Sequence, residues 1–175
     1  ALTAHLTPSC TLQEISLRSG LLMDCRGCSY HVCSQYALHN RCFYGGAIPD
    51  KVFPAILQAD ALLLLCPNYN DALSAHITAF INRLTALLIH NNLENKYLYA
   101  IIVSGYSGGD LVAQQVLGAL SLNKSFMLPP RFCMWETANS PGEALQIPGV
   151  QDRVRAFGQN IVSAILSPGP EGPAQ

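Results

Sequence analysis

The chain has 175 residues, of which 50% are hydrophobic and 12% charged, and its formal net charge is −1. This length suits one domain with a substantial core, and the composition excludes a disordered chain. A net charge near zero and the lack of a dense run of Lys or Arg argue against an electrostatic surface for nucleic acid or a membrane. No apolar run is long enough to cross a membrane, and no signal peptide is visible.

The chain contains seven cysteines. An odd number of cysteines without a signal peptide argues against a secreted disulfide scaffold and predicts a cytoplasmic protein. Cys10, Cys66 and Cys133 lie apart from the others, and we expect them to pack as small apolar residues. The first residue is Ala rather than Met, which favours a processed product or a fragment.

The hydrophobic pattern predicts alternating strands and helices. Residues 11–17 alternate apolar and polar side chains, which indicates a half-exposed strand. A short helix is expected over residues 49–58, with its prolines near the first turn. The run "ADALLLLC" at 59–66 predicts a strand buried on both faces, as in a parallel sheet. Residues 74–90 carry apolar side chains at helical spacing and predict an amphipathic helix.

The second half continues the same alternation. Residues 97–104 predict a buried strand, after which Asp110 is expected to cap a helix. Asp71, after the preceding strand, is also expected to be a helix cap. Residues 131–136 predict another strand, and a last helix buries Val154, Phe157, Ile161 and Ile165. We expect one domain over residues 1–166 and a disordered tail over 167–175.

Two unusual turns are predicted at one edge of the sheet. Strands that alternate with helices form parallel sheets, whose ligands bind at the carboxyl ends of the strands. The turns "CPNYND" and "GYSGGD" both follow strands there. Tyr69 could cover one face of a flat heterocycle, with Asn68 and Asn70 bonding its edge. The glycines could cradle the same ring or an anion. An ordinary turn explains the first motif as well as a ligand does, and it is the favoured explanation of the glycine motif taken alone.

Four cysteines crowd into one short segment. Cys25, Cys28, Cys33 and Cys42 have the spacing C-x2-C-x4-C-x8-C. They could ligate zinc or an iron–sulfur cluster, with His31 as an extra ligand. A redox-active Cys25–Cys28 pair is an alternative. The spacing differs from the standard ferredoxin runs, which favours a third interpretation, reduced thiols that only shape a loop.

The sequence from 59 to 88 resembles the central motif of the flavodoxin-like NAD(P)H-dependent FMN reductases. That motif is an apolar strand, then Pro-x-Tyr-Asn, here Pro67, Tyr69 and Asn70, then an amphipathic helix. The turn from 105 to 109 is similar to the family's second flavin loop. The cysteine segment resembles the branch called multimeric or iron–sulfur flavodoxins. The chain departs from the family in a helix that often carries Lys and Asp, where Thr78 and Asn82 stand.

The resemblance implies an α/β, flavodoxin-like three-layer sandwich with a central parallel sheet. It implies bound FMN that takes hydride from NAD(P)H and passes electrons to a small-molecule acceptor or redox partner, in a homodimer or homotetramer. It also makes an iron–sulfur cluster on the four cysteines conceivable. No catalytic acid or base is assigned. The implied flavin contacts are Pro67, Asn68, Tyr69, Asn70, Asp71, Gly105, Tyr106, Ser107, Gly108 and Gly109.

Two other functions remain open. One is a flavodoxin-like electron carrier, and the other is a non-catalytic module that has lost FMN. The family begins with a strand and a Ser/Thr/Gly-rich loop for the FMN phosphate, and this sequence is expected to start after both. The domain is therefore predicted to be incomplete at its amino end. It is also predicted to bind FMN weakly unless another segment or subunit holds the phosphate.

Overall fold

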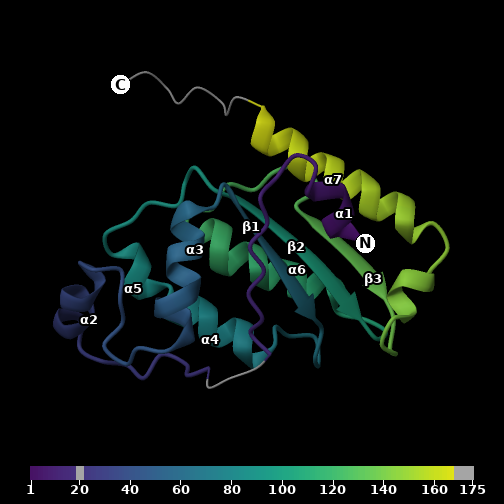
Figure 1. Ribbon diagram of the computed structural model, residues 1–175. Coiled ribbons are helices and arrows are strands. Elements are labelled where there is room, and N and C mark those ends of the chain that lie inside the picture. Colours follow the sequence, from purple (N-terminus) through teal and green to yellow (C-terminus); the bar gives the residue numbers. More distant parts are fainter. Residues whose placement is uncertain (19–21, 168–175) are drawn as a thin grey trace.

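The computed structural model describes residues 1–18 and 22–167, which form a mixed α/β structure (Figure 1). Its sheet has the strand order β1-β2-β3, with β1 at Ala61–Pro67, β2 at Tyr97–Ser104 and β3 at Cys133–Thr137. Both pairs are parallel. Ala61 lies opposite Tyr97, and Ala100 lies opposite Cys133. The predicted parallel sheet is confirmed.

Helices surround the sheet. The α-helices are α1 Leu2–Leu6, α2 Tyr30–Ala37, α3 Phe53–Gln58, α4 Ala75–Arg83, α5 Thr85–Leu88, α6 Gly109–Val116 and α7 Val150–Leu166. Two π-helical turns, η1 Ile48–Val52 and η2 Leu117–Leu122, adjoin α3 and α6, and the 3₁₀ turn η3 spans Glu143–Gln146. None of the helices in the described part is long and apolar enough to span a membrane.

The core is divided between the two faces of the sheet. On one face, Leu98, Ala100 and Ile102 of β2 are fully buried against α3, α4 and α6. On the other, the Tyr99 ring packs edge-on against Phe157 of α7 at 5.7 Å between ring centroids. Helix α1 also packs against α7, and Figure 1 shows this pair on the side of the sheet opposite α6. This is the predicted three-layer, flavodoxin-like arrangement.

Two predicted helix caps are wrong. Helix α4 is capped by Ser74, whose Oγ accepts the N–H of Ile77 at 3.4 Å. Asp71 instead lies in a tight turn before it. Helix α6 begins after Gly108, so Asp110 lies in its first turn rather than at the cap. An acidic side chain there still interacts favourably with the helix dipole.

The predicted strand over residues 11–17 is also wrong. These residues have no regular structure, and Ile15 and Leu17 pack partly against the core beside the helices. Alternate apolar side chains of residues 11–17 are therefore partly buried although this segment does not pair with a strand of the sheet. Among the described residues, β1 pairs with β2 alone. The predicted helix over 74–90 divides into α4 and α5 at Leu84, and the predicted tail beyond Ser167 lies outside the described residues.

Candidate functional site

The first loop of the site follows β1 and closes into a two-residue hairpin. The N–H of Tyr69 donates to the carbonyl of Ala72 at 3.3 Å, and the reverse bond is 3.2 Å. Between them, Asn70 and Asp71 have φ values of 53° and 58°. Asn and Asp tolerate this left-handed conformation better than other non-glycine residues. The turn leaves 61% of Tyr69 exposed at the sheet edge.

Asn68 connects this hairpin to the loop after β2. Its backbone N–H donates to the Val103 carbonyl at 2.9 Å. Its side-chain Nδ2 donates to Ser104 Oγ at 2.9 Å and to the Ser107 carbonyl at 2.6 Å. Its Oδ1 is buried and has no partner among the described residues. One amide therefore positions both loops and leaves an acceptor unused.

The second loop, residues 105–109, packs closely against its neighbours. A Cβ at Gly108, where φ is 77°, would overlap the carboxylate of Asp71. A Cβ at Gly105 would overlap the Asn139 side chain. The glycines are therefore required for the approach of three protein loops as well as for turning. Tyr106, between them, is 92% exposed.

A third loop, which the sequence analysis missed, follows β3. The Nδ2 of Asn139 donates to the Gly105 carbonyl at 3.0 Å. Glu143 Oε2 accepts the N–H groups of Ser140 and Asn139 at 2.8 and 2.9 Å, and these bonds lower the pKa of Glu143. The predicted strand over 131–136 could have revealed this loop. The carboxyl end of a third parallel strand must lie at the same edge of the sheet as the other two, and so must the loop that follows it.

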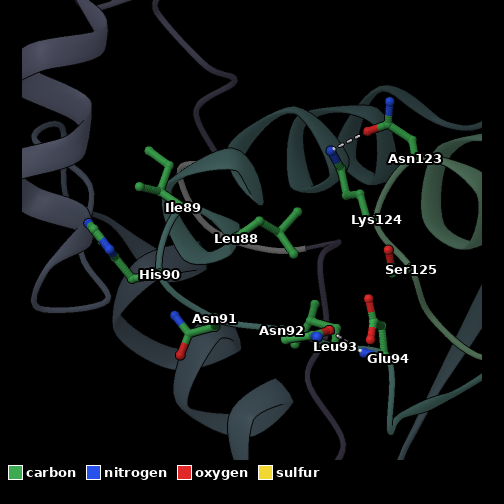
Figure 2. Close-up of a pocket in the computed structure, with 10 residues that line it drawn as sticks. All are labelled: Leu88, Ile89, His90, Asn91, Asn92, Leu93, Glu94, Asn123, Lys124 and Ser125. Carbon is green, nitrogen blue, oxygen red and sulfur yellow. Dashed lines mark hydrogen bonds between the residues drawn. The ribbon is translucent and has the colours of Figure 1, made fainter. Parts of the chain in front are cut away.

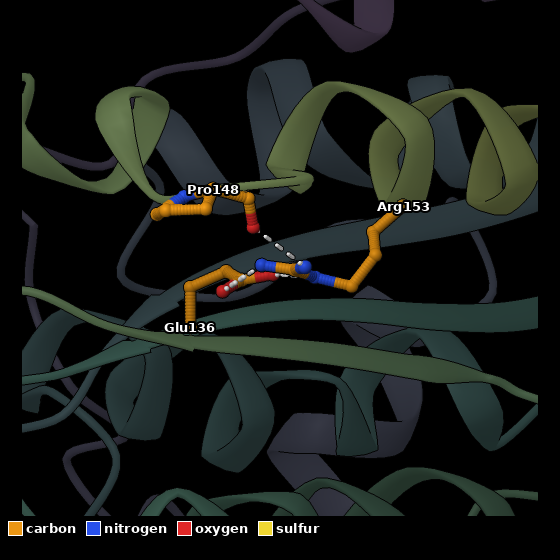
Figure 3. Close-up of polar contacts among 3 residues, drawn as sticks. All are labelled: Glu136, Pro148 and Arg153. Carbon is orange, nitrogen blue, oxygen red and sulfur yellow. Dashed lines mark hydrogen bonds and ion pairs between the residues drawn. The ribbon is translucent and has the colours of Figure 1, made fainter.

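The Glu136–Arg153 ion pair anchors this third loop from beneath (Figure 3). The guanidinium holds both oxygens of the buried Glu136 carboxylate, with distances of 2.6 and 2.8 Å, and also donates to the Pro148 carbonyl at 3.1 Å. The hydrogen bond to Glu136 raises the pKa of Arg153. The pair thus links β3, α7 and the segment between them.

Two further side chains at this edge were not predicted. Gln115 of α6 accepts the N–H of Leu73 at 3.0 Å and donates to the Asp71 carbonyl at 3.1 Å. It clamps the end of the hairpin. Trp135 is 55% exposed. Its Cγ would lie 3.6 Å from a Cβ at Gly109, so the indole lies beside the glycine turn.

The arrangement has features that fit a flavin ring. Several backbone N–H groups donate to no other group of the part of the chain that the structure describes, those of Asn70, Asp71, Tyr106 and Ser107. The ring of FMN carries carbonyl oxygens and nitrogens that accept such bonds. Two exposed aromatic side chains, Tyr69 and Tyr106, stand next to these donors. The loops contain no Lys or Arg over 67–72, 104–109 or 138–149, so they offer the phosphate no cation.

Two surface hollows lie away from this edge. One, of about 520 Å³, is lined by residues 88–94 and 123–125, which precede β2 and β3 at the amino edge of the sheet (Figure 2). The other lies between residues 13–17 and the helical turns around Pro54. Neither hollow is lined by a residue of the three loops.

The cysteine segment is attached to α4 on another part of the molecule. Arg83 is 3% exposed and donates to the carbonyls of Gly45 at 2.7 Å and Met23 at 3.4 Å. Asn82 Nδ2 donates to Asp24 Oδ1 at 3.0 Å. Asn82, the noted departure from the family, therefore positions the chain next to Cys25.

All seven thiols are free. Within residues 1–18 and 22–167, no three His, Cys, Asp or Glu side chains are placed to hold a metal ion. Metal binding by Cys25, Cys28, Cys33 and Cys42 therefore stays a prediction. Burial raises the pKa of Cys66 to about 12 and that of Cys133 to about 11. These two thiols pack as apolar groups in or against the core, as predicted, whereas Cys10 is partly buried outside both core clusters of the described residues.

Several solved structures are similar to this chain. The Trp repressor binding protein from Bacillus subtilis is 22% identical, with a TM-score of 0.52 over 61% of this chain and 69% of that chain. RosB with the bound intermediate 8-demethyl-8-formylriboflavin-5'-phosphate is 20% identical, with a TM-score of 0.48 over 66% and 47% of the two chains. The flavodiiron protein from Giardia intestinalis is 14% identical, with a TM-score of 0.47 over 76% and 32%.

Sequence comparison gives a more specific result. No curated protein matches the chain. The family model described as NADPH-dependent FMN reductase matches residues 10–140, which include β1, β2, β3, the first two loops of the site and the start of the third. The chain therefore belongs to the NADPH-dependent FMN reductase family.

Proposed function

We propose that this chain binds FMN at the carboxyl edge of its sheet and transfers electrons from NAD(P)H to a small-molecule acceptor or a redox partner. The observation that carries the proposal is the convergence of three strand-end loops, joined by Asn68 and Asn139, around exposed tyrosines and unused N–H groups. Membership of a flavin-dependent oxidoreductase family supports it.

The protein residues would bind and orient the cofactor. When bound, FMN supplies the hydride-accepting ring. The N–H groups of Tyr106 and Ser107 would donate to its polar edge, and Tyr69 or Tyr106 would cover a face. Asn68, Gln115 and Asn139 hold the loops in place without a cofactor. Preorganised donors of this kind lose little entropy when the ring binds.

The three loops provide no Lys or Arg side chain to bind the phosphate of FMN. Charge-assisted hydrogen bonds to a phosphate are the strong ones, each contributing about 1.5–3 kcal/mol. A lack of a few such bonds lowers affinity by several powers of ten, since about 1.4 kcal/mol is tenfold. We therefore propose that FMN affinity depends on a phosphate site outside the described loops. The predicted homodimer or homotetramer stays a prediction.

Two measurements test the proposed function. The visible spectrum of the purified chain, alone and after addition of FMN, shows whether a flavin is held. NADPH and NADH oxidation by the FMN-loaded protein, with a free flavin or quinone as acceptor, then shows whether it is a reductase. Flavin binding with slow oxidation of both nucleotides would indicate an electron carrier. No flavin binding, even at high FMN concentration, would contradict the proposal.

A further inference from the structure

The cysteine segment contains one thiol pair whose geometry is set by a helix start. Helix α2 is capped by Ser29, whose Oγ accepts the N–H of Val32 at 3.4 Å. Cys28 therefore precedes the cap, and Cys33 is the fourth helical residue. Side chains at these two positions characteristically pack against each other and fix the angle at which the chain enters the helix. The contact is usually made by two hydrophobic residues, whereas here both are cysteines.

The surroundings of Cys33 agree with this contact. Burial raises the pKa of the Cys33 thiol, and Cys28 raises it further through its charge and a hydrogen bond, ahead of Cys42 and Cys25. Both thiols are partly buried and free, whereas Cys25 is exposed. Cys33 also packs against the main core, which restrains it next to its partner.

We propose that Cys28 and Cys33 form a reversible disulfide by exchange with a low-molecular-weight disulfide such as oxidised glutathione. The Cys28 thiolate attacks the reagent, forms a mixed disulfide and releases one glutathione thiolate. The Cys33 thiolate then attacks the Cys28 sulfur and releases the second. Each cysteine gives up one proton, and the released thiolates take up two. The two cysteines are oxidised, and the reagent is reduced to two glutathione molecules.

The bond would attach α2 to the segment before it. That segment is already held to α4 by the hydrogen bonds from Asn82 to Asp24 and from Arg83 to the Met23 carbonyl. Oxidation would therefore attach α2 covalently to a segment that hydrogen bonds hold against α4, while the carboxyl-edge loops keep their own contacts. This inference does not depend on the proposed flavin function.

The sequence makes the disulfide simple to identify. Trypsin cleaves after Arg26 and Arg41, so Cys28 and Cys33 fall in one peptide, residues 27–41, that contains neither Cys25 nor Cys42. The full-length chain is incubated with oxidised glutathione, its remaining thiols are alkylated, and it is digested without reduction. We expect the 27–41 peptide to be unalkylated and lighter by two hydrogens, and dithiothreitol to reverse this.

Variants give matched controls. Cys25→Ser and Cys42→Ser should retain the modified peptide, and Cys28→Ser should lose it. The unmodified chain remains informative even if a variant folds poorly. The proposal is overturned if residues 27–41 become linked mainly to the peptide of Cys25 or Cys42, or if Cys28 and Cys33 are both still alkylated. Stoichiometric metal in anaerobically prepared protein, with all four thiols protected, would also overturn it.

Discussion

The side-chain amide of Asn68 donates a hydrogen bond to Ser104 Oγ at 2.9 Å, joining the residue after β1 to the last residue of β2. Ser104 is itself 3% exposed and hydrogen-bonds the Ser107 carbonyl. Asn68 and Ser104 are 36 residues apart in the chain, so this hydrogen bond joins two loops that are distant in sequence. The site depends on this junction for its shape.

Replacing Asn68 with Ala should destabilise the protein by about 1–3 kcal/mol, because each lost hydrogen bond contributes about 0.5–1.5 kcal/mol. Urea unfolding measures this change. Asn95, an exposed turn residue, is the matched control, and Asn95→Ala should change stability by less than about 0.5 kcal/mol. Equal effects of the two substitutions would show that the junction contributes nothing.

Replacing Gly108 with Ala should be more damaging than replacing Gly142 with Ala. Both glycines have positive φ, 77° and 82°, but only Gly108 faces a side chain, that of Asp71. Gly142→Ala should cost about 1–2 kcal/mol from backbone strain alone. Gly108→Ala should cost more, and Asp71→Ala should recover part of the difference in the double variant. Simple additivity in this double-mutant cycle would contradict the steric explanation.

FMN should quench the fluorescence of Trp135, the single tryptophan of the chain. The indole is exposed beside Gly109, so a flavin on the glycine loop would lie next to it. Quenching should follow the same binding curve as flavin fluorescence, after correction with free tryptophan. Saturable flavin binding that leaves Trp135 emission unchanged would place the ring elsewhere.

Riboflavin should bind the described chain within about tenfold of FMN, a difference of about 1.4 kcal/mol. The three loops carry no Lys or Arg for the phosphate that riboflavin lacks. Titrations followed by flavin fluorescence compare the two ligands directly. FMN binding a hundredfold or more tighter would mean that the phosphate is held by residues that we have not identified.

Stability should fall as pH rises above about 9. Burial raises the pKa of the Cys66 thiol from 9.0 to about 12 and that of Cys133 to about 11. Above pH 9 and below its raised pKa, each thiol is ionised in the unfolded chain but still protonated in the folded chain. In that range each group lowers the free energy of unfolding by about 1.4 kcal/mol per pH unit. Urea unfolding at pH 8 and 10.5 measures the fall, which Cys66→Ala should reduce. An equal loss of stability in Cys66→Ala would show that groups other than Cys66 cause the pH dependence.

Local sequence patterns determined the framework of this protein. The apolar runs before Pro67 and Gly105 have no polar face, which correctly predicted two parallel strands. The central strand β2 is largely buried on both faces, whereas Leu65 of the edge strand β1 is 63% exposed, so the predicted burial of β1 on both faces is wrong. Residues at helical spacing over 75–83 and 150–166 likewise identified α4 and α7. The Pro-x-Tyr-Asn element was enough to indicate the family, which the match over residues 10–140 confirmed. The placement of the predicted ligand residues followed from topology, because parallel strands bring their carboxyl ends together.

Tertiary structure decided the features that depend on contacts between distant residues. Alternation over 11–17 indicated a strand, but Ile15 and Leu17 are buried against helices, and side-chain spacing alone does not distinguish these outcomes. Asp71 looks like a cap in sequence, yet its carboxylate occupies the space left by Gly108. Asn139, Gln115 and Trp135 join the site only because the chain returns to the same edge. A local pattern reports which face of an element is buried, whereas its neighbours are chosen by packing over the whole chain.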